Sequence, residues 1–335
     1  MFDPQHYRVE DEESGLLAFI VIDDTSLGPA AGGIRTRAYP DEESALADAH
    51  ALARAMTYKC ALAGLPAGGG KGVVMLRESM RREAAFEHLG GFIESLGGRF
   101  LTAGDLGTTP ADLHAMSRRT SHVYTDEAGL AGSVGLGCVR AMQACIAVRS
   151  PDAVDLAGTR VAVQGCGTVG AAVARAAAAA GAEVLVADLD AEAAAALSAD
   201  LSASIVDPDR IFAVDAEILA PCAVGGVVSS EVAGSTPARA ICGAANNILA
   251  APEVEAVLAE RGVLWVPDPL SSAGAVIEGV GRRVMGLTDC SSLIDRIFDT
   301  TRSVLEEARR LRRPAGEVAA ALAESRIRER RRSAG

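Results

Sequence analysis

The segment from residue 158 to residue 190 constrains the fold most, because it contains the whole pattern of a β-α-β unit. It reads GTRVAVQGCGTVGAAVARAAAAAGAEVLVADLD: a buried apolar strand, a glycine turn, a helix of small residues, a second apolar strand and an acid. Gly165, Gly167 and Gly170 form G-x-G-x-x-G between the first strand and the helix. Glycines there permit a tight turn, the close approach of a pyrophosphate and close packing of the helix.

An acid completes this dinucleotide fingerprint. Asp188 ends the second strand, eighteen residues after Gly170, where a carboxylate accepts hydrogen bonds from an adenosine ribose. The same carboxylate repels a 2′-phosphate, so the sequence favours NAD over NADP. The alternative is a turn whose glycines serve packing alone. The cofactor-binding residues that this unit predicts are Gly165, Gly167, Thr168, Val169, Gly170 and Asp188.

Other segments extend the pattern to an α/β chain. The first third mixes a strand-like run at 15–23 with an amphipathic helix that begins near Asp41, and a long charged helix from about Ser291 closes the chain. At 335 residues and 49% hydrophobic composition, the chain is long enough for two domains with their own cores. Further strand-like runs, which fit parallel strands of the β-α-β sheet, lie at 216–223, 240–246 and 262–268.

Lysine occurs at only two positions, Lys59 and Lys71, in a chain that carries 30 arginines. Arginine stays charged in any protein setting, whereas the pKa of a lysine falls when its ammonium is desolvated or lies beside another cation. Two lysines on either side of a glycine loop, GLPAGGGKG, would lower each other's pKa. We therefore expect one lysine to bind an anionic substrate group and the other to act as acid and base.

A candidate carboxylate partner follows in the segment RFLTAGDLGTTPADL. Asp105 lies there after a strand-like stretch, on a loop. The alternative for an aspartate before a glycine is an ordinary turn residue. The glycine loop itself is not a P-loop, since Leu65 stands where the first glycine of G-x-x-x-x-G-K-[ST] should be and Gly72 follows the lysine.

Composition excludes several classes of function. A net charge of -12 disfavours nucleic acid or an anionic membrane surface as a partner. We find no N-terminal signal segment and no uninterrupted apolar run of about 20 residues, so we expect no membrane association. Seven cysteines are scattered singly with no C-x-x-C pair, which argues against a disulfide framework and a structural zinc site. We expect no metal, reduced thiols and a cytoplasmic location.

Six strings occur in the order found in one dehydrogenase family. They are GPAAGGIRTRAYPDEESALADAHALARAMTYKCALAGLPAGGGKGVV, LTAGDLGTT, VAVQGCGTVG, APCAVGGVV, CGAANNIL and VPDPLSSAGAVI. Over roughly residues 10 to 330 the chain resembles the glutamate/leucine/phenylalanine/valine dehydrogenase family, most of all its leucine and phenylalanine branch. The resemblance implies an N-terminal α/β catalytic and oligomerisation domain (1–134), a Rossmann domain (135–290) and a cleft between them. It also implies a C-terminal helix, about 291–335, that packs back on the first domain.

The resemblance further implies a reaction and a role for several residues. The reaction is the reversible, NAD-dependent oxidative deamination of a non-acidic L-amino acid to its 2-oxo acid and ammonia, in a homo-oligomer that is at least a dimer. Lys59 binds the substrate α-carboxylate, while Lys71 and Asp105 move protons as water adds to the imine carbon. Other residues expected near the ligands are Gly32 and Gly33 at the substrate and Asn246 and Asn247 at the nicotinamide ribose.

Some positions depart from the family's pattern. Ala31 stands where glutamate-specific members carry a lysine and the amino acid branch usually carries leucine, so we expect a non-acidic substrate and extra room. Ser272 replaces an asparagine that contacts the substrate, and Val134 lies near the place of a threonine that bonds the nicotinamide amide. The helix that lines the side-chain pocket with aliphatic groups in leucine-preferring members carries Thr300, Thr301 and Ser303.

Two other functions compete with an amino acid dehydrogenase. The departures at Ser272 and Val134 suggest a catalytically silent NAD-binding homologue that acts as a scaffold or sensor. A hydroxy acid dehydrogenase would use the same Rossmann half. Retention of Lys59, Lys71 and Asp105 argues against the silent homologue, and the lack of a plausible catalytic histidine motif argues against the hydroxy acid enzyme.

Overall fold

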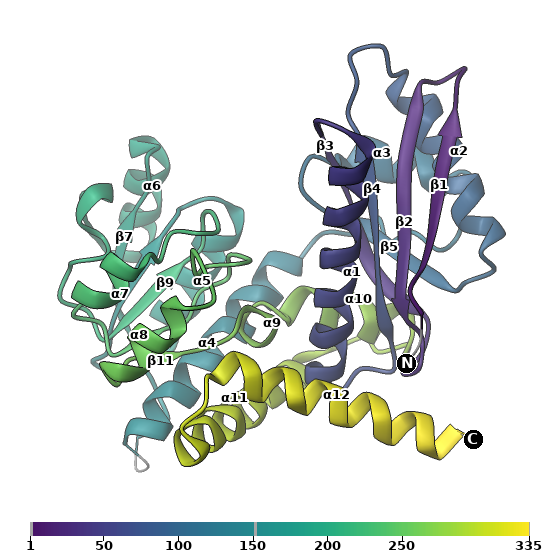
Figure 1. Ribbon diagram of the computed structural model, residues 1–335. Coiled ribbons are helices and arrows are strands. Elements are labelled where there is room, and N and C mark those ends of the chain that lie inside the picture. Colours follow the sequence, from purple (N-terminus) through teal and green to yellow (C-terminus); the bar gives the residue numbers. More distant parts are fainter. Residues whose placement is uncertain (1–2, 151–152, 335) are drawn as a thin grey trace. The chain divides into compact units, whose positions relative to one another are not determined.

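The computed structural model describes residues 3–150 and 153–334 and divides into two compact units (Figure 1). Unit 1 comprises Met1–Ala128, Gly279–Thr288 and Ala323–Gly335, and unit 2 comprises Gly129–Glu278 and Asp289–Leu322. The segment 291–335, which we expected to pack on the first domain, is divided between the units. Asp289–Leu322 groups with unit 2, where α11 (Ser291–Leu311) buries its apolar face against α4 (Leu130–Arg149), and Ala323–Gly335 groups with unit 1.

Unit 1 is built on a five-stranded mixed sheet. Its strands lie in the order β1 (Gln5–Asp11), β2 (Leu16–Asp24), β4 (Gly68–Met75), β3 (Ala30–Arg37) and β5 (Phe100–Gly104). The first three strands of that order pair antiparallel, and β4, β3 and β5 pair parallel. Its first three helices are α1 (Glu42–Ala63), α2 (Arg82–Ser95) and α3 (Pro110–Ser117).

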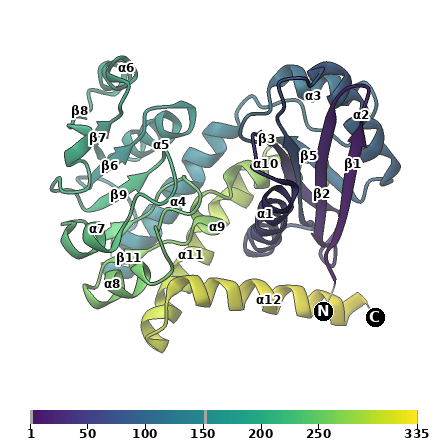
Figure 2. The same cartoon turned by 45° about the horizontal axis from the view of Figure 1, so that its top comes forward.

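Strand β2 explains why this sheet is covered on both faces. All nine of its residues are buried. Leu17, Phe19 and Val21 pack with the alanines of α1, whereas the alternate residues pack with α2 and α3, as a period of two requires. Helix α1 therefore covers one face of the sheet, and α2 and α3 cover the other (Figures 1 and 2). As predicted, α1 begins after its N-cap Asp41 and ends at Gly64, whose φ is 66°.

The glycine-rich segment around Lys71 is a strand, not the loop that the sequence predicted. It forms β4, next to β2 and β3 in the sheet. A Cβ at Gly69 would lie 2.1 Å from the backbone nitrogen of Thr57 on α1, and a Cβ at Gly70 would lie 2.9 Å from the ring of Phe100. The glycines let neighbouring elements approach the strand closely, so they serve packing rather than a turn.

Unit 2 is built on a six-stranded parallel sheet. The order is β8 (Ser204–Ile205), β7 (Glu183–Ala187), β6 (Arg160–Gln164), β9 (Ile218–Pro221), β10 (Ala240–Ile241) and β11 (Leu264–Trp265). The chain winds outward from β6 in one direction and from β9 in the other, which is the doubly wound order of dinucleotide-binding sheets. The predicted α/β fold with a Rossmann sheet is confirmed. The two-residue strand β8 was not predicted.

The helices of unit 2 include one that is unusually apolar. By length and composition, α4 could cross a membrane, but 61% of its apolar window is buried and it packs against α5 and α11, as a core helix does. The remaining helices are α5 (Thr168–Ala179), α6 (Ala191–Leu201), α7 (Ser230–Ser235), α8 (Val254–Glu260), α9 (Asp268–Ser271), α10 (Gly274–Arg283) and α12 (Ala315–Ala334), with a 3₁₀ turn at Pro208–Arg210.

The single closing helix predicted from the sequence is two helices, α11 and α12. Helix α11 ends at Leu311, and its C-cap Arg312 has a left-handed φ of 54°. Pro314 follows two residues later, and its fixed ring and missing N–H prevent the first helix from continuing. The sequence analysis missed this break because the charged residues on either side continue without interruption.

Candidate active site

Lys71 lies within β4 and contacts Asp105, the residue that directly follows β5. Nζ of Lys71 is 3.1 Å from Oδ1 of Asp105. The lysine side chain is 6% exposed and the aspartate side chain 23% exposed. The ammonium is thus enclosed by the protein, while its carboxylate partner remains within reach of a ligand.

Three residues that the sequence analysis missed extend this contact. Nε of Arg35 donates to Oδ2 of Asp105 at 2.8 Å, and its Nη1 lies 3.2 Å from Oδ2 of Asp48 on α1. The hydroxyl of Tyr39 donates to the same Asp48 oxygen at 2.5 Å. A continuous row of contacts therefore runs from Tyr39 through Asp48, Arg35 and Asp105 to Lys71, all within unit 1.

Strand pairing places these groups together. Because β3 lies between β4 and β5, Ile34 pairs with both Gly72 and Gly104. The residues next to these three positions, Arg35, Lys71 and Asp105, therefore meet across the sheet. One signal for Arg35 was present in the sequence: an arginine in the apolar, glycine-rich string AAGGIRTR needs an acidic partner if the string is buried.

Burial and neighbouring charges shift the pKa values of the site. Desolvation lowers the pKa of Lys71, and the attraction of Asp105 offsets only part of that effect. Burial alone would raise the pKa of Asp105, but Lys71 and Arg35 outweigh it and hold that pKa below its ordinary value. Arg35, which the sequence analysis did not consider, also lowers the pKa of Lys71, because it shares the carboxylate of Asp105. The mutual lowering expected between Lys59 and Lys71 stays a prediction.

The other predicted substrate residues lie on the same unit. Lys59 is half-buried in the last turns of α1, the helix that packs on β4. Ala31, Gly32 and Gly33 lie on β3, and Ala31 is 5% exposed. A Cβ at Gly32 would lie 1.8 Å from the carbonyl oxygen of Gly70, so sheet packing already explains that glycine.

The fingerprint turn of unit 2 fits a dinucleotide. Gly165 has a φ of 102°, and a Cβ at Gly170 would lie 1.9 Å from the oxygen of Gly165, so both positions need glycine. Gly167 caps α5 with open space around its missing Cβ, which leaves the helix N-terminus accessible to a phosphate group. Thr168 and Val169 begin the helix. The turn lies where β6 and β9 diverge, at the switch point of the sheet.

Asp188 is held against this turn. Its Oδ2 accepts the backbone N–H of Cys166 at 2.5 Å and its Oδ1 accepts that of Asp190 at 2.8 Å. The carboxylate follows β7 directly, half-exposed, and its orientation is fixed by backbone donors. This is the position from which an acid contacts an adenosine ribose.

The remaining predicted residues also belong to unit 2. Asn246 and Asn247 are exposed on the loop after β10, and Asn247 has a left-handed φ of 52°. The hydroxyl of Ser272 donates to the carbonyl oxygen of Asp268 at 2.7 Å, and Val134 is 7% exposed on α4. Thr301 is fully buried in α11.

The seven cysteines are free, and six of them are buried. Burial raises the pKa of the Cys60 and Cys145 thiols to about 12, so these thiols stay protonated and unreactive. Across residues 3–150 and 153–334, no three His, Cys, Asp or Glu side chains are grouped so that they could hold a metal ion.

Comparison with known proteins decides the family. Residues 5–122 match the glutamate/leucine/phenylalanine/valine dehydrogenase dimerisation domain, and residues 189–280 match the glutamate/leucine/phenylalanine/valine dehydrogenase domain. The leucine dehydrogenase of Geobacillus stearothermophilus is 38% identical over 327 residues, which cover 95% of this chain and 89% of that one. This chain belongs to the glutamate/leucine/phenylalanine/valine dehydrogenase family.

Other relatives agree with this family membership. The valine dehydrogenase of Streptomyces albus is 37% identical, over 96% of this chain and 91% of that one. The crystal structure of L-tryptophan dehydrogenase from Nostoc punctiforme superposes with a TM-score of 0.87 and 34% identity, over 98% of this chain and 96% of that one. The hetero-hexameric glutamate dehydrogenase of Thermus thermophilus, in its Leu-bound form, gives a TM-score of 0.78 at 26% identity, over 99% and 89% of the two chains.

Family membership confirms the resemblance and the class of enzyme. The chain is an amino acid dehydrogenase, an oxidoreductase of a family that depends on pyridine nucleotides. These relatives give no support to a catalytically silent homologue or to a hydroxy acid dehydrogenase.

Proposed function

We propose that this chain catalyses the reversible, NAD-dependent oxidative deamination of a non-acidic L-amino acid to its 2-oxo acid and ammonia. The contact between Lys71 and Asp105 carries this proposal. Acid and base chemistry at an imine carbon needs a group that can lose and regain a proton. A buried lysine whose pKa is lowered, held 3.1 Å from a partly exposed carboxylate, is such a group.

The mechanism follows from those two side chains. When bound, the nicotinamide supplies the hydride acceptor for the substrate Cα. After the substrate ammonium has lost one proton to solvent, loss of hydride leaves an iminium, and neutral Lys71 takes a proton from water as the new C–O bond forms. The resulting ammonium lies against Asp105, which can pass that proton to the amino nitrogen. Ammonia then leaves with its bonding electrons as the carbinol loses its proton to Lys71 and the carbonyl forms.

We assign substrate binding to unit 1. Lys59 would hold the α-carboxylate, with the backbone of Gly32 and Gly33 nearby. Arg35, itself held by Asp48, would keep Asp105 ionised and correctly oriented. The predicted division of labour, with a catalytic domain at 1–134 and an NAD-binding domain at 135–290, remains part of this proposal.

Cofactor binding would fall to unit 2 and favour NAD over NADP. Gly167 leaves the N-terminus of α5 open for the pyrophosphate, and Thr168 and Val169 follow it. The fixed carboxylate of Asp188 would accept the ribose hydroxyls and repel a 2′-phosphate. Asn246 and Asn247 would lie near the nicotinamide ribose.

The substrate side chain would be apolar. The matched relatives are named for leucine, valine and L-tryptophan, and Ala31 offers no charge to a glutamate side chain. Ala31 and Ser272 are smaller than the residues usual in the branch, so a side chain of different shape from leucine would be preferred.

Assembly and location complete the proposal. The matched dimerisation domain covers residues 5–122, and β1 is an edge strand of unit 1, so a homo-oligomer built through this unit is expected. Free, buried cysteines suit a reducing cytoplasm. Nucleic acid and membrane lipids are not expected as partners of a chain with a net charge of -12.

A screen for NADH formation with free amino acids at alkaline pH tests the function. Leucine, valine, tryptophan, phenylalanine, glutamate and 2-hydroxy acids are compared, and an ammonia assay confirms loss of the amino group. Activity with an apolar amino acid, absent with glutamate and with hydroxy acids, is expected. NADH binding without turnover of any amino acid would restore the silent homologue.

A further inference from the structure

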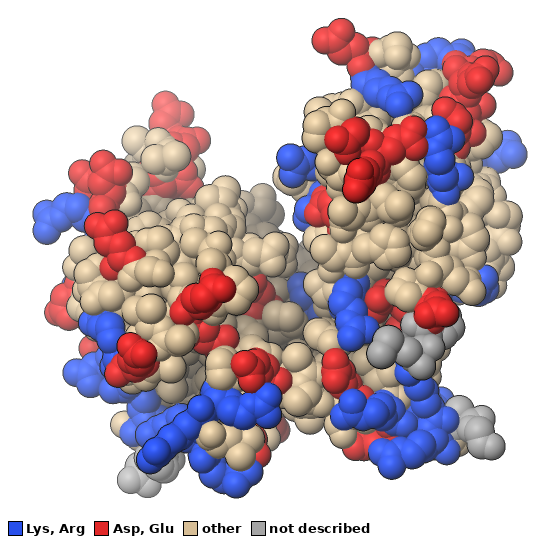
Figure 3. All heavy atoms as spheres, in the orientation of Figure 1, with Lys and Arg blue, Asp and Glu red and all other residues tan. Residues whose placement is uncertain are grey.

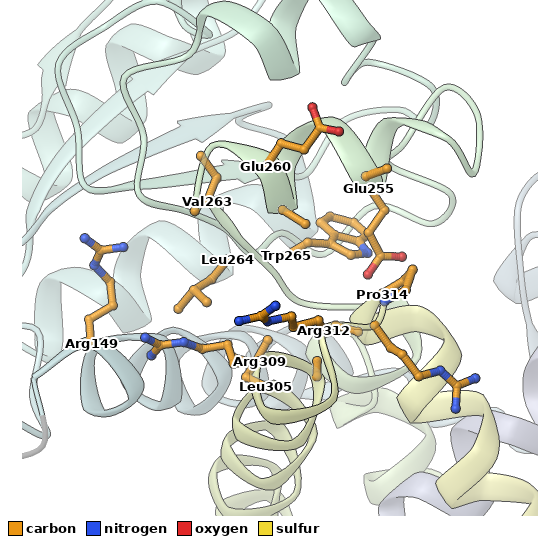
Figure 4. Close-up of a pocket in the computed structure, with 16 residues that line it drawn as sticks. Arg149, Glu255, Glu260, Val263, Leu264, Trp265, Leu305, Arg309, Arg312 and Pro314 are labelled. Carbon is orange, nitrogen blue, oxygen red and sulfur yellow. The ribbon is translucent and has the colours of Figure 1, made fainter.

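A cavity of about 780 Å³ lies within unit 2, lined by residues that the proposed function does not use. It forms where the end of α4, the region of α8 and β11, and the connection between α11 and α12 meet (Figure 4). Its apolar lining includes Val263, Leu264, Trp265 and Leu305, and its basic lining includes Arg149, Arg309 and Arg312.

The three arginines are exposed side chains. Across the described residues, none of Arg149, Arg309 and Arg312 forms an ion pair, and Arg309 donates only to the carbonyl oxygen of Val148 at 2.9 Å. Burial, then the charges of Arg239 and Arg309, lower the pKa of Arg149. Figure 3 shows basic side chains gathered over α11, on a chain whose net charge is -12.

The acids that line the cavity are engaged elsewhere or exposed. Oε1 of Glu255 accepts the backbone N–H of Gly316 at 3.0 Å, at the start of α12, and burial raises the pKa of this carboxyl. Glu260 is an exposed side chain at the end of α8. The three arginines outnumber these two acids, so the lining carries an excess of positive charge.

The C-cap of α11 positions the side chain of Arg312. This residue has a φ of 54° and caps α11, at a position where glycine meets no steric cost and is usually preferred. The chain keeps an arginine there, and its side chain lines the cavity (Figure 4). The cap that ends α11 therefore places a guanidinium at the cavity.

We propose that this cavity binds a phosphorylated small molecule with two or more negative charges. Guanidinium groups from α4 and from the α11–α12 connection match phosphate oxygens through paired hydrogen bonds. The cavity has the volume of a small-molecule site, which is larger than a bare phosphate needs. The apolar wall would contact the organic part of the ligand.

Fluorescence titration tests this site, because Trp265 is the only tryptophan of the chain and lines the cavity. The full-length protein is titrated with pyrophosphate, inorganic phosphate and phenyl phosphate at constant ionic strength. NADH is present at the concentration that fills one site per chain by calorimetry, so that the fingerprint turn does not bind the probes and the cavity stays open to them. Calorimetry gives the stoichiometry.

Two double variants distinguish binding in the cavity from non-specific attraction to positive charge. Arg309→Gln with Arg312→Gln removes two cavity arginines. Arg302→Gln with Arg310→Gln removes two arginines of α11 that pair with Glu306 and Glu307 outside the cavity. We expect one pyrophosphate per chain and weakening by about tenfold or more in the cavity variant, with less than a twofold change in the control.

Each other result counts against the proposal. Equal weakening of pyrophosphate binding in both double variants would show only non-specific attraction. Unchanged binding in the cavity variant would show that pyrophosphate binds at another site. Failure of the unmodified chain to bind pyrophosphate would exclude an anion site. Phenyl phosphate that binds no more tightly than inorganic phosphate would exclude the contact with the apolar wall. Loss of NADH binding would instead concern the proposed dinucleotide site.

Discussion

Replacing Arg35 by glutamine should shift the pH dependence of oxidative deamination upward. Arg35 and Lys71 contact the two oxygens of one carboxylate at 2.8 and 3.1 Å. Two cations placed in this way lie about 5–6 Å apart, and at an effective dielectric constant of about 20 they repel each other by roughly 3 kcal/mol at most. Solvent around the partly exposed Asp105 reduces that repulsion.

The direction of this pH shift follows from the proposed role of Lys71 as a base. Arg35 lowers the pKa of Lys71, so without it the ammonium keeps its proton to higher pH. Because only neutral Lys71 can accept the proton of water, the rising limb of kcat should move upward by about one to two pH units. Asp48 raises the pKa of Lys71, so Asp48→Asn should move the same limb downward.

Steady-state kinetics from pH 7 to 11 measure both shifts. Arg37→Gln is the matched control, because Arg37 is an exposed residue two positions along the same strand, stacked on Tyr39 rather than bonded to Asp105. Arg35→Lys keeps the positive charge and should keep the pH profile of kcat, even if loss of the two-pronged guanidinium lowers kcat itself. An unchanged limb in Arg35→Gln, in protein that still binds NADH, or an equal shift in Arg37→Gln, would refute the electrostatic argument.

Three further results are expected. Lys71→Arg should lower turnover by about 100-fold or more with NADH binding intact, because arginine does not release its proton. Lys59→Arg should mainly raise KM for the amino acid. Near-normal turnover in Lys71→Arg would contradict the proposed mechanism. Asp188→Ser should narrow the ratio of kcat/KM for NAD over NADP by roughly tenfold, and equal use of both cofactors by the unmodified chain would remove the argument. Gly69→Ala should lower the free energy of unfolding, measured in urea, by about 3 kcal/mol or more, since its Cβ would lie 2.1 Å from a backbone nitrogen of α1. In Gly91→Ala the new Cβ meets no atom within 4 Å, so the free energy of unfolding should stay the same or rise.

Local patterns were enough to predict the elements whose causes are local. The β-α-β unit follows from apolar strands, turn glycines and the terminal Asp188. Helix α1 follows from its acidic N-terminus and from Gly64 at its end. Strand β4 was predicted as a loop because its glycines are required by the close approach of Thr57 on α1 and Phe100 on β5. Those contacts exist only in the folded sheet.

The candidate site divides in the same way. Lys71 and Asp105 could be chosen from their chemistry, and the structure brings them together, although their roles stay predictions. Arg35, Asp48 and Tyr39 could not be joined to them from the sequence, because their contacts depend on β3 lying between β4 and β5 and on α1 packing across the sheet. The break after Arg312 was missed for a different reason: Pro314 is a local signal, but the helical charge pattern hid it.

The packing of β4 also explains why this chain, which otherwise uses arginine, needs lysine at position 71. A Cβ at Gly70 would strike the ring of Phe100, and a Cβ at Gly72 would lie 2.2 Å from the side chain of Ile34, so the strand is enclosed on both sides of the lysine. Such enclosure removes water from the ammonium and leaves its charge to be set by Asp105 and Arg35. An arginine in that place would stay charged at any pH, and its wide fork would compete with Arg35 for the same carboxylate. The enclosure and the choice of lysine both fit the proposed role of Lys71, which requires a cation that can lose its proton.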